Sequence, residues 1–143
     1  MKLTFLTVAL MLTGSVHAGD IAEESKKLIE RVVTQYKEKG PNGFLSAAAK
    51  NGPVMSDKSA KDIIDGLVQI EAMCGKPVDH SIKKIAQLSD SVTSVLFIVN
   101  LEKCPVFFRQ TIYRTKAGNV VTSNFNLHTQ PEVIWPSNVI FPN

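Results

Sequence analysis

Three polar side chains alternate with apolar ones near the end of the chain, in the segment SNFNLHTQPEVIWPSN. If this segment is a β-strand, Asn124, Asn126 and His128 share one face of it. Phe125 and Leu127 then share the other. A histidine titrates near neutrality and can transfer protons, whereas asparagine amides only hydrogen-bond a ligand. The row is therefore a binding or catalytic site, or it is the solvent-facing side of an edge strand.

A catalytic site would make this protein a small pocket enzyme of the hydrolase or isomerase type, with His128 as its acid–base group. Asp79, His80 and Asp90 are its candidate partners, but no spacing in the sequence pairs any of them with His128,. Gln110 would add a further hydrogen-bonding amide beside the asparagines.

Which face of the strand points towards the helices decides between a functional site and a solvent-facing row. If Phe125 and Leu127 point under the helices, the polar row points away from any cavity there, as solvent-facing side chains do. The opposite facing would leave an apolar patch that a partner or a homodimer through the sheet face would bury. We expect the solvent-facing row, with a partner surface as the functional alternative, although one β-bulge reverses every later assignment.

Two cysteines, Cys74 and Cys104, are most simply a disulfide in an oxidising compartment,. Closing a loop of this length stabilises the fold by roughly 3 to 4 kcal/mol in the loop-entropy model. Two buried thiols, or a nucleophilic Cys104 near His128, are the alternatives. His80 belongs to no ligand spacing with these residues, so we expect neither a metal nor another cofactor.

The only tryptophan, Trp135, follows the last expected strand within PEVIWPSNVIFP. It either folds back as a lid on the core or belongs to a proline-stiffened arm that docks on a neighbouring chain. The segment FFRQTIYR, at positions 107–114, interleaves aromatic residues and arginines. Such side chains could stack on bases or sugars. A half-buried strand with arginines at its rim has the same pattern, and this is the interpretation that we favour.

The first eighteen residues resemble a cleavable signal peptide. Lys2 precedes an apolar run that ends before Gly14, and Val16 and Ala18 are the small residues that a signal peptidase requires,. The run is about half of the ~20 residues that a membrane span needs. We therefore expect a periplasmic or secreted protein with no stable membrane span, comprising residues 19–143 as a single domain with a proline-rich tail from about residue 129.

The charge balance argues against nucleic acid as a partner. Without Lys2, basic residues number 15 and acidic residues 13, and they are interspersed along the chain. Nucleic acids and anionic membranes normally require a dense basic face. The chain also contains no phosphate-binding loop, dinucleotide fingerprint or nucleophile elbow.

Helices precede strands in the expected order of elements. Apolar periodicity predicts one helix from Asp20 to Lys39, ended by Gly40 and Pro41, and a short second helix at 43–50,. A third helix begins after an N-cap at Ser56 and carries either Met73 or Cys74 on its apolar side. Four strands follow, at about 81–88, 91–101, 105–114 and 119–128, and their short connections favour an antiparallel meander.

This order predicts an α+β fold with N-terminal helices packed on a four-stranded antiparallel sheet. The arrangement resembles the cystatin-like or nuclear transport factor two-like roll of small exported bacterial proteins. The ending VVTSNFNLHTQPEVIWP, at positions 120–136, also resembles last strands of uncharacterised members. The resemblance implies a cone-shaped space between helices and sheet, but that fold hosts enzymes, carriers and assembly subunits alike.

We therefore expect an exported, non-enzymatic domain that binds an unidentified protein or small ligand, with the pocket enzyme as the alternative. The candidate binding residues are Gln110, Asn124, Asn126, His128 and Trp135.

Overall fold

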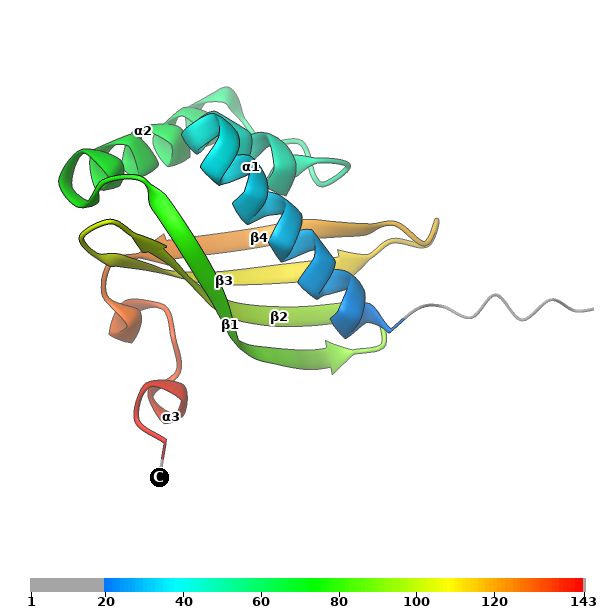
Figure 1. The fold of residues 1–143 in the computed structure, drawn as a ribbon. Helices are drawn as coiled ribbons and strands as arrows, with labels where there is room; N and C mark the ends of the chain where they lie inside the picture. Colours follow the sequence, from blue (N-terminus) through cyan, green and yellow to red (C-terminus); the bar gives the residue numbers. More distant parts are fainter. Residues whose placement is uncertain (1–19, 143) are drawn as a thin grey trace, which may run out of the picture.

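The computed structural model describes residues 20–142, so the signal-peptide prediction for residues 1–18 lies outside the described residues. Its fold is α+β, with helices followed by an antiparallel four-stranded meander, and this confirms the predicted fold class. α1 and α2 cover one face of the sheet, and η1 and α3 lie on its other side (Figure 1). The elements are α1 (Ile21–Ala49), α2 (Asp57–Cys74), β1 (Pro77–Ser89), β2 (Val92–Leu101), β3 (Pro105–Arg114), β4 (Val120–His128), the 3₁₀ helix η1 (Pro131–Val133) and α3 (Ser137–Ile140).

α1 consists of two helical segments joined at Gly40. The side chain of Asp20 caps its start by accepting a hydrogen bond from the Ala22 amide at 3.0 Å,. Gly40 has φ 65°, a conformation that glycine adopts with little strain, and it interrupts the helix where the sequence predicted,. The second segment begins at Pro41, slightly earlier than predicted, because proline is well suited to a first helical turn.

α2 is lightly packed. Ser56 caps it by accepting a hydrogen bond from the Ser59 amide at 3.2 Å, as predicted. Its buried residues are Leu67 and Cys74, whereas Met73 is exposed. Among residues 20–142, no helix combines the length and the apolar character that crossing a membrane requires.

The strands follow the order β1-β2-β3-β4, so β1 and β4 are the edges. β1 begins at Pro77, four residues before the predicted start at Ser81. Proline is tolerated as the first residue of an edge strand. Register shifts near positions 78, 83 and 88 also interrupt the alternation on which the prediction relied,.

Aromatic rings fill the interior between α1 and the sheet. Phe44, from the second segment of α1, lies 5.5 Å from Tyr36 and 5.3 Å from Phe108, measured between ring centroids. Phe108 stacks on Phe97 at 4.8 Å. All four side chains are fully buried, so this part of the fold is a packed core,.

Candidate binding site

The polar row of β4 lies on the face of the sheet opposite α1 and α2. Phe125 and Leu127 pack against the core beneath the helices. Asn124, Asn126 and His128 occupy the alternate positions, and their cross-strand partners on β3 are Thr111, Arg109 and Phe107,. Asn124 is exposed, whereas Asn126 and His128 are half-buried.

His128 lies far from Asp79, His80 and Asp90, its candidate partners for acid–base catalysis. Its Nδ1 accepts a hydrogen bond from the Gln130 amide at 3.0 Å. Asp79 accepts a hydrogen bond from Asn100 on the far side of the sheet, and His80 and Asp90 also lie on or beyond β1. Three strand spacings separate β1 from β4, roughly 14 Å,.

Gln110 is fully buried in the middle of β3, on the face covered by the helices. Its Nε2 donates a hydrogen bond to Oγ1 of Thr122 on β4. Its Oε1 has no hydrogen-bond partner among the described residues. Gln110 therefore contacts β4 on the face that the helices cover. It does not share a face with Asn124, Asn126 or His128.

An open pocket of about 370 Å³ lies where the loop between α1 and α2 meets the start of β4. Asn124 of the predicted row lines it, together with hydroxyl groups and apolar side chains. None of the described residues that line the pocket has an ionisable side chain. The lining residues are Ala48, Ala49, Pro53, Val54, Met55, Ser56, Ser59, Ile63, Thr122, Ser123, Asn124 and Phe125.

The loop that closes this pocket is seated directly on β4. A Cβ atom at Gly52 would lie 2.8 Å from the backbone oxygen of Thr122. Only a glycine permits this approach without a shift of one backbone relative to the other. The sequence predicted that the second helix ends at residue 50, but nothing in it indicated that the segment after this helix contacts β4.

A second hollow of about 290 Å³ adjoins the first along the same strand. The two share Ile63 from α2 and Phe125 from β4. We call the two together the α2–β4 groove. The second hollow is lined by Asp62, Ile63, Gly66, Phe125, Asn126 and Leu127.

Trp135 folds back onto the outer face of the sheet, beside β3. Its Nε1 donates a hydrogen bond to the backbone oxygen of Phe108 at 3.0 Å. Its ring meets that of Phe107 edge to face at 5.2 Å, and only 8% of its surface is exposed. The side chain thus covers the sheet from the side opposite the helices and is not part of an exposed arm.

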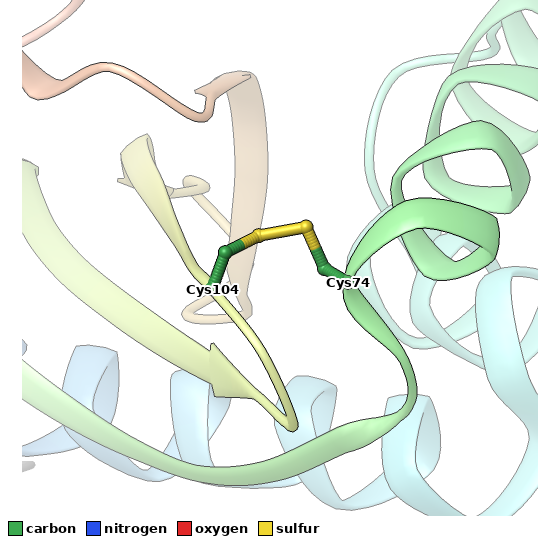
Figure 2. The surroundings of a disulfide bond; sticks show 2 residues. All are labelled: Cys74 and Cys104. Atoms are coloured by element: carbon green, nitrogen blue, oxygen red, sulfur yellow. A yellow bond between two sulfur atoms is a disulfide. The ribbon is translucent and has the colours of Figure 1, made fainter.

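The predicted disulfide between Cys74 and Cys104 is confirmed, with the two Cα atoms 5.3 Å apart. Figure 2 shows that it joins the end of α2 to the chain entering β3. The Lys103 amide also donates to the Cys74 carbonyl at 2.8 Å. Neither sulfur is therefore a free nucleophile, and within residues 20–142 no group of three histidine, cysteine or acidic residues converges on a metal-sized site.

Tyr36 of α1 and Glu71 of α2 lie close together where the two helices meet. The hydroxyl of Tyr36 is buried next to the carboxylate of Glu71, which forms an ion pair with Lys76. Burial, and secondarily the negative charge of Glu71, raise the pKa of Tyr36 well above its ordinary value,. This phenol therefore stays protonated under ordinary conditions.

Comparisons with models of protein families, with curated proteins and with solved structures found no match for this chain.

Proposed function

We propose that this protein is an exported, non-enzymatic binding domain whose ligand site is the open pocket between the α1–α2 loop and β4. The pocket itself carries this proposal. It offers about 370 Å³, and the residues that line it are apolar ones, three serines, one threonine and Asn124. Small-molecule sites in proteins share this combination of an apolar lining and a few polar groups. The matching ligand is an uncharged molecule with both apolar and hydrogen-bonding parts.

The chemistry of the pocket favours binding over catalysis. General acid–base catalysis needs a titratable group within hydrogen-bond reach of the reacting atoms. The described residues that line the pocket carry no side chain that titrates near neutrality,. His128, the acid–base group of the alternative enzyme, points to the opposite face of the sheet.

Two further features agree with the proposal. The Cys74–Cys104 disulfide supports export, because disulfides persist mainly in oxidising compartments,. Helices packed over an antiparallel meander support a roll of the cystatin-like or nuclear transport factor two-like kind. Because aromatic side chains fill the core, the ligand site that we propose is at the margin of the fold.

The proposal is tested by NMR screening of the ¹⁵N-labelled protein against a library of small uncharged amphipathic molecules. We expect hits to shift the amide signals of residues 122–125 and of the loop at 51–56. Ser59→Phe should block these hits by filling the pocket, whereas Ala72→Phe, on an exposed and distant part of α2, should not. Hits that cluster around His128, or a complete lack of hits, would contradict the proposal.

A further inference from the structure

The two edges of the sheet differ in how they discourage pairing with another strand. β1 carries Asp79, Lys83 and Lys84 and has register shifts along its length. Charges and bulges of this kind protect edge strands from association. β4, with the sequence VVTSNFNLH, contains no acidic residue, lysine, arginine or proline. Its single register shift and its contact with Gly52 both lie near its start, at residues 122–124, so the edge from Asn124 to His128 lacks the charges and bulges that protect β1,.

The α2–β4 groove follows β4, including the part of its edge that carries no charge or bulge. Its first hollow is lined by β4 residues 122–125 and its second by residues 125–127, and residues of α2 line both hollows from the other side. A strand edge offers donors and acceptors in alternation at regular spacing, and a second peptide backbone is the chemical group that matches this pattern. A groove between a helix and a strand edge can thus hold an extended peptide, as in β-augmentation.

Gly66 supplies an independent observation. It lies in the interior of α2, where glycine costs about 1 kcal/mol relative to alanine,. Nothing in the described chain explains this cost, because a Cβ at this position would meet no atom within 4 Å. The missing side chain instead widens the second hollow of the groove. Glycine is characteristic of places where another molecule approaches a backbone closely.

The charges around the groove indicate the kind of peptide. Asp62 lines the second hollow but forms an ion pair with Lys58 at 2.8 Å. The first hollow has no ionisable lining among the described residues, and the facing segment of β4 has no acidic or basic side chain other than His128 at its end. Charge complementarity therefore favours an occupant without charged side chains, because a buried unpaired charge would be costly.

We propose that the ligand of this protein is an uncharged peptide segment that pairs with β4 as a fifth strand and inserts an apolar side chain beside Phe125. This inference rests on the proposed function and specifies its ligand. Backbone pairing along β4 supplies affinity, and the two hollows select side chains at alternate positions of the peptide.

The test uses a displayed library of random heptapeptides composed of Val, Leu, Phe, Thr, Ser and Asn. Peptides selected on the protein are resynthesised and titrated by fluorescence anisotropy. N-methylation of the alternate residues that pair with β4 should weaken binding at least about tenfold, since each removes a backbone donor. The same modification shifted by one residue should leave the affinity within about twofold, because those amides face away from β4.

Matched variants locate the peptide. Gly66→Phe should weaken binding at least about tenfold by filling the second hollow, whereas Ala72→Phe on the exposed side of α2 should not change it,. Circular dichroism checks that both variants keep their helices. Protection of β4 amides from hydrogen exchange in the complex would be the direct sign of strand pairing.

Each contrary outcome is distinct. If small uncharged molecules bind the pocket but no heptapeptide does, or if both methylation patterns act equally, the peptide inference fails and the proposed function stands. If neither class of probe binds, both proposals fail. If the protein sediments as a dimer that Gly66→Phe disperses, the occupant of the groove is a second copy, and the peptide inference is overturned.

Discussion

Gln110, fully buried in β3, donates a hydrogen bond from Nε2 to the hydroxyl oxygen of Thr122 on β4. Thr122 lines the open pocket. The interior of the sheet is thus connected to the wall of the candidate site by a polar contact. The contact also spans the register shift that follows Thr111, so it helps to hold β4 in place where its pairing with β3 is irregular,.

Removing only one partner of this hydrogen bond should lower the stability of the protein. Thr122→Val leaves a buried amide donor unpaired and should lower the free energy of unfolding by about 1 to 3 kcal/mol in urea titrations. The double variant Gln110→Leu/Thr122→Val should regain most of this loss, because no polar group is then stranded. Thr129→Val, at an exposed position, is the control and should change stability by less than about 0.5 kcal/mol,. Strict additivity of the two single changes would contradict the interpretation.

Loss of the disulfide should destabilise the protein by roughly 3 to 4 kcal/mol, the loop-entropy value for a separation of 30 residues,. Because α2 has few other buried residues, the hydrogen-exchange rates of its amides should rise more than those of the β2 amides when the disulfide is removed,. Cys74→Ala/Cys104→Ala is the variant to compare by urea unfolding and hydrogen exchange. A reductant should affect the wild type and leave this variant unchanged. Equal unfolding midpoints for both proteins would refute the prediction.

Trp135 should report its burial through fluorescence, because it is the only tryptophan. We expect blue-shifted emission that acrylamide quenches weakly. Trp135→Phe should cost about 1 kcal/mol through loss of the bond to Phe108,, and Trp135→Ala about 3 kcal/mol through loss of packing. Phe141→Ala, at a side chain that is 66% exposed, provides the matched control in the same tail. Emission typical of a solvated indole would show that the tail does not dock on the sheet.

Alkaline conditions should weaken the fold through Tyr36. Its pKa is raised in the folded state, so above pH 10 the unfolded chain loses a phenolic proton that the folded chain keeps,. Stability should fall as the pH rises above 10, by up to about 1.4 kcal/mol per pH unit from this group. Tyr36→Phe should lack this component when it is compared with the wild type across the alkaline range. Tyr113→Phe, at an exposed phenol, should keep the component, and identical pH profiles for all three proteins would contradict the assignment.

Much of the fold follows from signals that extend over a few neighbouring residues. Ser56 caps α2, and Gly40 interrupts α1, as the sequence predicts. Short turns make the strand order follow the chain order, and two cysteines leave one intramolecular pairing. These features were predictable because caps, breakers, periodicity and loop length act locally.

Other features depend on how distant segments pack. The early start of β1, the inward direction of Gln110 and the side of the sheet that Trp135 covers result from register, bulges and the return of the tail. The groove is the clearest case, because Ile63 and Phe125 come from far apart in the chain and each reads as an ordinary apolar residue. A hollow depends on the space that several packed elements leave between them, and no local pattern of residue types records that space.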